Sequence, residues 1–284
     1  MKFILLFSAV ALLMVFFSGQ VVASGITVFH ADSLAGPMKE LKAAFEAKRK
    51  GGTVSLVTGR SELLAEQILK GDTCDVFAPS SAAVIENLLL GKKITSTNMD
   101  AATWYIIFSA NEMVVITKKG NPLGIKRITD LSKPDVKFTR VTGEKDLGTS
   151  RTITFLKQAA ALEGQPDLAQ KIIDGSIVDL SKPHTVPDTI RAVIEGKANA
   201  GVVYYSAAVA AKDNLDIIRF PDNVNLSDKI QNAATVSGTA KNKEMAVDFV
   251  IFILSPEGQN ILKQTGQPPV VPAIRKGAVP AEIQ

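Results

Sequence analysis

The sequence has 284 residues, of which 46% are hydrophobic and 21% are charged. This length and composition suit a globular protein with two domains of ordinary size, and they exclude a low-complexity or disordered chain. The formal net charge is +4, and the basic residues are dispersed along the chain, with Lys48-Arg49-Lys50 as the only run of three. Because that run ends a predicted helix, it indicates a solvated helix end, and we expect no nucleic-acid partner.

The first 23 residues have the pattern of a secretory signal peptide. Lys2 precedes an apolar run of about fifteen residues, and Val21-Val22-Ala23 supplies small residues for cleavage. The apolar run is short for a bilayer span and lacks a basic flank on its far side, which argues against a membrane anchor. Residues 1–23 are therefore predicted to be a signal peptide, and the mature protein is expected in the periplasm.

The chain contains one cysteine and two histidines. A single thiol, Cys74, cannot form an internal disulfide. It precedes the apolar run Asp75–Ala78, which favours a buried and inert thiol. With so few soft ligands the sequence predicts no transition-metal cluster.

Short apolar strands alternate with helical patterns in the first part of the chain. This alternation predicts a parallel sheet that is covered by helices on both faces. In such a sheet the loops at the carboxyl ends of the strands form the ligand crevice. The predicted strands cover residues 26–28, 53–58 and 75–78, and the predicted helices cover 34–45, 62–70 and the region of 84–89.

Two serines lie where the chain leaves a predicted strand and enters a predicted helix. Ser33 is a candidate N-cap of the first helix, and Ser61 begins the second. A hydroxyl at such a place lies beside the free N–H groups of a first helical turn and the positive end of the helix dipole, so it can bind an oxyanion. Most N-cap serines only cap their helix, and the two interpretations stay open at this point.

The middle of the chain predicts a crossing to a second lobe. Two apolar extended stretches, Trp104–Phe108 and Met113–Thr117, flank Asn111-Glu112, where we place the crossing. Extended stretches at 217–220 and 233–236 are expected to carry the chain back. The remaining predictions are a short helix at 128–131, strands at 136–141 and 200–204, and helices at 151–162, 166–173, 187–195, 245–254 and 255–263.

Several phrases of the sequence, in this order and spacing, resemble the periplasmic molybdate/tungstate-binding proteins of ABC importers. The resemblance covers residues 25–272, and the stretch from Trp104 to Met113 looks like the branch best known from archaeal tungstate binders. Single phrases occur in many solute-binding families, so the resemblance depends on their order. The phrases are His30-Ala-Asp-Ser-Leu, Gly59-Arg-Ser, Leu64-Ala-Glu-Gln-Ile, Asp75-Val-Phe-Ala, Gly201-Val-Val-Tyr204 and Leu254-Ser-Pro-Glu-Gly-Gln.

The resemblance implies the type II periplasmic-binding-protein fold. This is an α/β fold of two lobes, each with a mixed, mostly parallel sheet flanked by helices, joined by crossing strands, with the oxyanion in the cleft. The first lobe is expected to comprise residues 24–110 and a return segment, 222–284, and the second lobe residues 111–221. The implied function is a monomeric receptor that captures molybdate or tungstate and delivers it to the membrane subunits of an ABC importer, with no cofactor and no catalytic residues.

The resemblance also implies which groups hold the anion. Ser33 and Ser61 would donate hydroxyls from the first lobe, and Tyr204 would donate its phenol from the second. Main-chain N–H groups would come from Leu147 and Val186, so the side chains at these two positions matter little. No metal is expected beyond the metal of the bound oxyanion.

Asp146 leaves the coordination of that metal open. In the tungstate branch two carboxylates can join the metal directly, and Asp146 falls at or beside one of them, whereas Val186 stands where the partner glutamate is expected. Without the second carboxylate we expect a tetrahedral dianion held by neutral donors. Asp146 is alternatively a solvated loop residue or a cap for the helix expected at Arg151. The preference between molybdate and tungstate also stays open.

Two other functions compete with this interpretation. The same architecture could hold sulfate, phosphate, an organic anion or an iron complex, and Tyr204-Tyr205 keeps the iron alternative open, although adjacent side chains of a strand face opposite ways. A secreted hydrolase could use Ser33 with His30 or His184. The chain has no Gly-x-Ser-x-Gly motif, which argues against the hydrolase.

Overall fold

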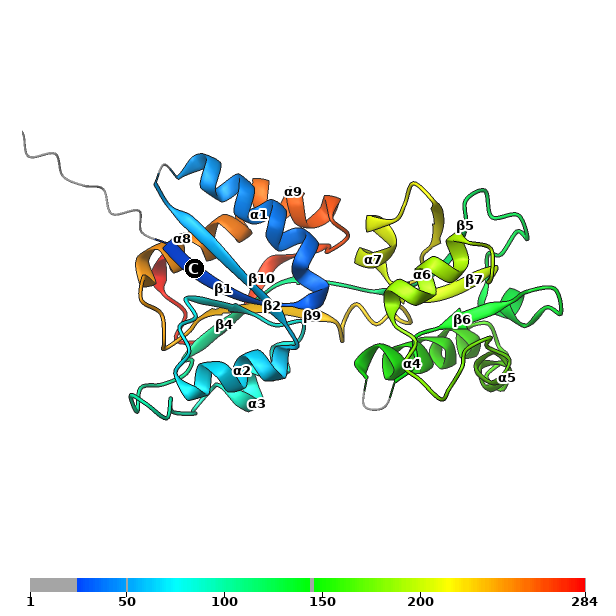
Figure 1. Cartoon of the computed structure of the whole chain (residues 1–284), viewed down its shortest axis with the longest axis horizontal. Coiled ribbons are helices and arrows are strands. Elements are labelled where there is room, and N and C mark those ends of the chain that lie inside the picture. Colours follow the sequence, from blue (N-terminus) through cyan, green and yellow to red (C-terminus); the bar gives the residue numbers. More distant parts are fainter. Residues whose placement is uncertain (1–24, 50, 144–145, 284) are drawn as a thin grey trace, which may run out of the picture.

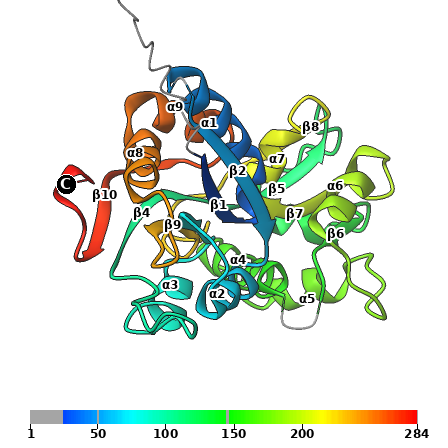
Figure 2. The same ribbon diagram turned by 60° about the vertical axis from the view of Figure 1, so that its left-hand side comes forward.

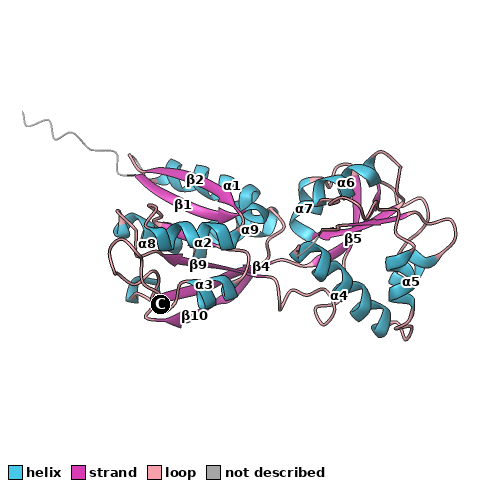
Figure 3. Ribbon diagram, turned by 60° about the horizontal axis from the view of Figure 1, so that its bottom comes forward, coloured by secondary structure: helices cyan, strands magenta, loops and turns pink. Residues whose placement is uncertain are grey.

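Alternation of strands and helices builds two sheets, each with its own helices. The structure is a computed structural model that describes residues 25–49, 51–143 and 146–283, so the predicted signal peptide lies outside the described residues. Within them, one sheet has six strands in the order β10-β4-β9-β3-β1-β2, and the other has four in the order β6-β7-β5-β8. The two sheets and their helices form two lobes that lie along the long axis of the molecule (Figures 1 and 3).

The first lobe combines the beginning and the end of the chain. Its strands are β1 (Gly25–Ala31), β2 (Thr53–Gly59), β3 (Val76–Ala78), β4 (Trp104–Ala110), β9 (Gln231–Val236) and β10 (Pro269–Gly277). Its helices are η1 (Asp32–Leu34), α1 (Ala35–Lys48), α2 (Ser61–Lys70), α3 (Ala82–Leu88), α8 (Lys243–Leu254), α9 (Pro256–Gln264) and η3 (Ala281–Ile283). Helices α1, α8 and α9 cover one face of the sheet, and α2 and α3 cover the other (Figures 1 and 2).

Each face of the first sheet has its own hydrophobic core because side chains alternate along a strand. From β1, Ile26 and Val28 enter the core under α1 and α8, whereas Phe29 enters the core under α2 and α3. On the α1 side the Phe45 and Phe249 rings meet edge to face, with their centroids 5.1 Å apart. The sheet is thereby buried on both sides, as the apolar runs of β1 and β3 predict.

The second lobe comprises the middle of the chain. Its strands are β5 (Met113–Lys118), β6 (Phe138–Arg140), β7 (Ala200–Tyr204) and β8 (Leu215–Ile218). Its helices are η2 (Ile128–Ser132), α4 (Leu147–Leu162), α5 (Leu168–Asp174), α6 (Val186–Ile194) and α7 (Tyr205–Ala210). The return to the first lobe begins later than the predicted stretch 217–220, because Ile217 and Ile218 belong to β8 and pair with β5 inside the second sheet.

Strand directions give two mixed sheets in which most strands point the same way. Strand β1 pairs in parallel with β2 and β3, and β9 runs antiparallel to both β3 and β4. Four of the six strands of the first sheet, β1 to β4, therefore share one direction, and β9 and β10 oppose them. In the second sheet β6, β7 and β8 share a direction and β5 opposes them.

Two chain segments cross between the sheets, and a buried carboxylate holds them together. The Glu112 side chain follows β4 and is 2% exposed. It accepts hydrogen bonds from the guanidinium of Arg219 and from the amide of Asn225, both on the returning segment. Next to it, Asn111 donates to the hydroxyl of Ser206 at 2.8 Å. A buried carboxylate is tolerated only with such partners, so the crossing is tied by satisfied polar contacts.

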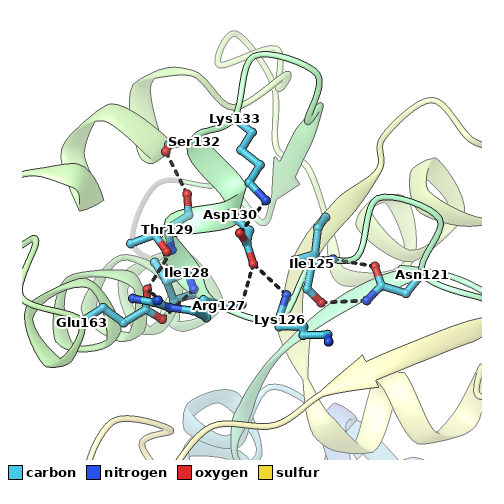
Figure 4. Close-up of polar contacts among 10 residues, drawn as sticks. All are labelled: Asn121, Ile125, Lys126, Arg127, Ile128, Thr129, Asp130, Ser132, Lys133 and Glu163. Carbon is cyan, nitrogen blue, oxygen red and sulfur yellow. Dashed lines mark hydrogen bonds and ion pairs between the residues drawn. The ribbon is translucent and has the colours of Figure 1, made fainter.

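The start of η2 is anchored to the far end of α4 (Figure 4). Glu163, directly after α4, accepts the main-chain N–H groups of Ile128 at 2.8 Å and Thr129 at 3.0 Å. Asp130 accepts those of Lys126 and Arg127. These contacts satisfy N–H groups that a short helix leaves free, and they hold α4 at its C-terminal end.

Among the described residues, no single helix has the length and hydropathy to cross a bilayer, and only α8 and α9 taken together, bent by 64°, meet both conditions.

Candidate functional site

In the first lobe, parallel pairing brings two predicted site residues to one edge of the sheet. The register of β1 with β2 pairs their last residues, Ala31 and Gly59. Ser33 and Ser61 each stand two residues beyond these partners. The sheet therefore places both serines at its carboxyl edge, although 28 positions separate them in the sequence.

Ser61 is the first residue of α2 and is 6% exposed. Its hydroxyl oxygen accepts a hydrogen bond from the main-chain N–H of Ser80, at 3.3 Å. Ser80 follows β3, which is the other parallel neighbour of β1, so a third loop reaches the same edge. Ser80 is not among the site residues predicted from the sequence. The signal was present, because Ser80 stands two residues after the end of a strand, as Ser33 and Ser61 do.

The prediction that Ser33 caps the first long helix is wrong. Ser33 lies inside the short 3₁₀ helix η1, and Leu34 occupies the cap position of α1 without a side-chain bond. The reason is a tight 3₁₀ turn between the strand and the α-helix, which moves the cap one residue further along. The main-chain carbonyl of Ser33 accepts a hydrogen bond from Gln267 at 3.1 Å. Among the described residues its hydroxyl has no partner and is free to bind a ligand.

In the second lobe, the predicted residues gather in the same way. Arg140 at the end of β6 pairs in parallel with Val202, so Thr142 and Tyr204 come out at the same edge. Thr142 exchanges two main-chain hydrogen bonds with His184, both 2.9 Å long. This bridge brings the loop before α6 to the loop before α4. The starts of α4 and α6 and the end of β7 therefore lie at one edge of the second sheet.

Leu147 and Val186 are the first residues of α4 and α6. The main-chain N–H of a first helical residue has no partner within its helix, so both are available to a ligand. Thr185 caps α6 in a capping box with Asp188. The Thr185 hydroxyl donates to the Asp188 carboxylate and lowers its pKa to about 2, so the box remains intact at mildly acidic pH.

Asp146 is the N-cap of α4. One of its carboxylate oxygens, Oδ2, accepts the main-chain N–H of Thr149 at 2.7 Å and the hydroxyl of the same residue at 3.0 Å. The interpretation of Asp146 as a helix cap is therefore confirmed. The helix it caps begins at Leu147, four residues earlier than the helix expected at Arg151, because the polar stretch Gly148–Ser150 is helical once Asp146 satisfies its first turn.

Tyr204 ends β7, and its phenol meets an arginine that the sequence analysis did not single out. The Arg151 guanidinium donates from Nη1 to the Tyr204 hydroxyl oxygen at 3.1 Å. Burial raises the pKa of Tyr204 and the nearby Asp146 carboxylate adds to this rise, whereas Arg151 opposes it, so the phenol is protonated at neutral pH. A basic residue near the start of a helix opposes the helix dipole, and this anomaly was the available signal for Arg151.

Tyr205 points to a different environment from Tyr204. It is the first residue of α7, and the guanidinium carbon of Arg219 lies 4.7 Å from the centre of its ring. Two adjacent tyrosines thus contact two different arginines, Arg151 and Arg219. Their surroundings therefore differ although they are adjacent in the sequence.

The histidines and the cysteine have structural partners. His30 is 1% exposed and lies between the carbonyl oxygen of Ala31, 2.9 Å from Nδ1, and the hydroxyl of Thr58, 3.0 Å from Nε2. Burial lowers its pKa. The thiol of Cys74 is fully buried and donates to the carbonyl of Val76, as an inert thiol would. In the part of the chain that the structure describes, no group of three or more histidine, cysteine or acidic side chains could hold a metal ion.

The donors of the first lobe and those of the second lobe lie on the sides where the two lobes face each other. Figure 1 shows the start of α1, beside Ser33, on the side of the first lobe that faces the second. The start of α4, beside Leu147, lies on the side of the second lobe that faces the first. An anion between the lobes could therefore be reached from both sheets.

The capping role of Asp146 leads to a stability prediction. Asp146→Ala removes the acceptor for Thr149 and should lower the free energy of unfolding by about 0.5–2 kcal/mol. Asp146→Asn keeps a side-chain oxygen at the cap and should leave stability nearly unchanged. Guanidinium unfolding followed by circular dichroism measures both. An asparagine variant as unstable as the alanine variant would contradict the capping role.

Comparison with known proteins identifies the family. Residues 26–267 match the model of the bacterial extracellular solute-binding proteins. The molybdate-binding protein ModA of Mycobacterium tuberculosis (strain ATCC 25618 / H37Rv) is 26% identical over 244 residues, which cover 86% of this chain and 84% of ModA. The molybdate/tungstate-binding protein WtpA of Pyrococcus abyssi is 24% identical over 321 residues, with coverage of 94% and 90%.

A solved structure shows the same fold. The substrate-binding domain of a protein described as a molybdenum ABC transporter, from Clostridium difficile, superimposes with a TM-score of 0.71 at 21% sequence identity, and the match covers 87% of this chain and 99% of that domain. The periplasmic molybdate-binding protein of Azotobacter vinelandii gives a TM-score of 0.61 at 17% identity, covering 85% and 98%. With its two-lobed type II architecture, this chain belongs to the family of bacterial extracellular solute-binding proteins.

Proposed function

We propose that this chain is a receptor that captures molybdate or tungstate between its lobes and delivers it to the membrane subunits of an ABC importer. The observation that carries the proposal is the convergence of hydroxyl and main-chain donors at the carboxyl edges of both sheets. The proposed ligands are Ser33, Ser61, Leu147, Val186 and Tyr204. The names of the relatives in both branches support the choice of anion.

The proposed donors suit a tetrahedral dianion. The hydroxyls of the two serines and of Tyr204 are neutral and can donate, and the first N–H groups of α4 and α6 lie at the positive ends of helix dipoles. Hydrogen bonds to an ionised partner are about twice as strong as those between neutral groups. A set of such donors can therefore hold two negative charges without a counter-charge in direct contact.

The place of Asp146 favours four-coordinate metal in the bound anion. Its Oδ2 atom is already shared by two groups of Thr149 at the start of α4. Only the other oxygen, Oδ1, is left for a metal, and Val186 stands where the tungstate branch would supply the second carboxylate. We therefore propose that Asp146 supports the site without joining the metal.

The divergence of the tyrosines favours an oxyanion over an iron complex. A pair of phenolates on one metal would need both hydroxyls at one point, whereas Tyr205 lies beneath Arg219 and Tyr204 meets Arg151. Burial also raises the pKa of Tyr204, which keeps its proton available for donation.

We also propose how the chain is divided and where it acts. Lobe boundaries at 110/111 and 221/222 fall between β4 and β5 and between β8 and β9, where the chain passes from one sheet to the other. Residues 1–23 are proposed to be a signal peptide that directs the protein to the periplasm, and the family's extracellular character supports this location. The mature protein is proposed to act as a monomer.

Calorimetric titration of the mature protein tests the ligand. We expect one site for molybdate or tungstate with a dissociation constant at or below roughly 1 μM, or −8 kcal/mol. Sulfate is a smaller tetrahedron and would leave some donors without a partner, at about 1–3 kcal/mol each. Sulfate and phosphate should therefore bind more weakly. Equal affinity for sulfate and molybdate would reject the proposed anion.

Removing one phenol tests the site. Tyr204→Phe deletes a donor to the anion and should weaken binding by about 1.5–3 kcal/mol, because hydrogen bonds to charged groups contribute that much. The matched control is Tyr205→Phe, one residue away, which should leave affinity unchanged because this ring lies against Arg219. The same titration measures both variants. A loss of affinity in Tyr205→Phe but not in Tyr204→Phe would contradict the proposed site and indicate binding beside α7.

Small-angle scattering tests whether the anion draws the lobes together. Ser33 and Ser61 belong to the first sheet's edge and Tyr204 to the second, so a bound anion would favour the closed arrangement by contacts that only this arrangement makes. The radius of gyration of the mature protein should fall when molybdate is added and should stay the same with chloride. An unchanged radius at saturating molybdate would argue against a shared site.

A further inference from the structure

We infer that Arg151 is a positioning residue that presets the Tyr204 hydroxyl as a hydrogen-bond donor to the anion, and that it thereby selects against oxyanions that carry a proton. The inference rests on the proposed function, because it concerns the same site. It assigns a role to a residue that neither the sequence motifs nor the proposed ligand set includes.

The direction of the contact between the two side chains is unambiguous. A guanidinium has only donors, so in the pair of Arg151 Nη1 and Tyr204 Oη, 3.1 Å apart, the phenol oxygen must accept. A hydroxyl proton cannot point at a group that is itself donating. The Tyr204 proton is therefore turned away from Arg151 and is left for another acceptor.

Within residues 25–49, 51–143 and 146–283, the Arg151 guanidinium is committed to the phenol of Tyr204. Among the described residues no carboxylate forms an ion pair with Arg151, and its one side-chain hydrogen bond goes to Tyr204. Its guanidinium carbon also lies 5.8 Å from the centre of the Tyr204 ring. The residue is one helical turn after Leu147 on α4, so it comes from the helix whose first N–H is proposed to face the anion.

The first lobe repeats this arrangement with a different donor. The hydroxyl oxygen of Ser61 accepts the main-chain N–H of Ser80, which likewise leaves the Ser61 proton for an outside acceptor. Both hydroxyls are thus engaged as acceptors on the protein side, and each presents its proton to a ligand.

Two hydroxyls that are held as donors have a chemical consequence. A fully deprotonated tetrahedral dianion accepts at every oxygen, whereas a protonated oxyanion such as hydrogen phosphate presents an O–H that needs an acceptor. With Arg151 in place the Tyr204 oxygen is already engaged. Without Arg151 the hydroxyl could rotate and accept from the ligand, so selectivity as well as affinity should change.

A double-mutant cycle tests whether Arg151 acts through Tyr204. Arg151→Met, Tyr204→Phe and the double variant are titrated with molybdate at about 1 M sodium chloride, where screening over about 3 Å suppresses the long-range attraction of the guanidinium. Arg151→Met should lower affinity about fivefold or more in the wild-type background, as for one hydrogen bond, and less than about twofold in the Tyr204→Phe background. Equal losses in both backgrounds would overturn the inference, because Arg151 would then contact the anion itself.

Selectivity supplies a readout that a merely structural role would not move. The ratio of the molybdate to the phosphate dissociation constant is measured by competition at pH 6, where phosphate carries a proton. Preference for molybdate should fall about threefold or more in Arg151→Met, as expected when an acceptor becomes free. Lys157→Met removes a positive charge from an exposed position of the same helix and should leave the preference unchanged. An unchanged preference in Arg151→Met would overturn the inference.

A replacement variant and the binding of the wild-type protein keep the test decisive. Arg151→Gln, which is also neutral, replaces Arg151→Met if melting curves show that the methionine variant does not fold. A wild-type protein that binds no molybdate would reject the proposed function and this inference with it. Wild-type binding combined with additive losses would reject the inference alone.

Discussion

The structure depends on parallel strand pairing in register. Pairing β1 with β2 and β3, and β6 with β7, makes distant segments leave their sheets at the same edge. Loops and helix starts follow these strand ends, and the first turn of a helix carries N–H groups without partners. Because of this pairing, hydroxyls and main-chain donors gather at the edge of each sheet. The proposed donors come from several segments of the chain.

The segments that connect the two sheets must hold the lobes together and still allow the lobes to move relative to each other. The chain crosses twice, and Glu112 joins the crossings through Arg219 and Asn225. Removing one partner of such a buried carboxylate leaves a charge uncompensated, which is strongly destabilising. The lobes are otherwise packed around separate cores, so the crossing is where a change in their relative position would be absorbed.

At the proposed site the electrostatics would favour an anion without placing an ion pair on it. Asp146 is the nearby acid, and its role as a helix cap engages it with Thr149. Arg151 reaches the site through the phenol of Tyr204. Neutral donors avoid the desolvation cost of burying a cation beside the anion, and they leave size and protonation as the properties that distinguish one tetrahedral anion from another.

Much of the fold could be predicted from sequence, since apolar periodicity and the alternation of strands and helices are local properties. The order of recognisable phrases also led from the sequence to Ser33, Ser61 and Tyr204 as candidates. Local patterns misplaced the cap of α1, which depends on a 3₁₀ turn, and the start of α4, which depends on the Asp146 cap. They also placed the return from the second lobe too early, because the pairing of β8 with β5 is a long-range contact.

The contacts that orient the site were decided by tertiary structure alone. Arg151 and Tyr204 are 53 positions apart, and Ser61 and Ser80 are 19 apart. The residue types gave no reason to join either pair. Strand register and helix packing set which distant side chains meet, and hydrogen-bond direction follows only once they do.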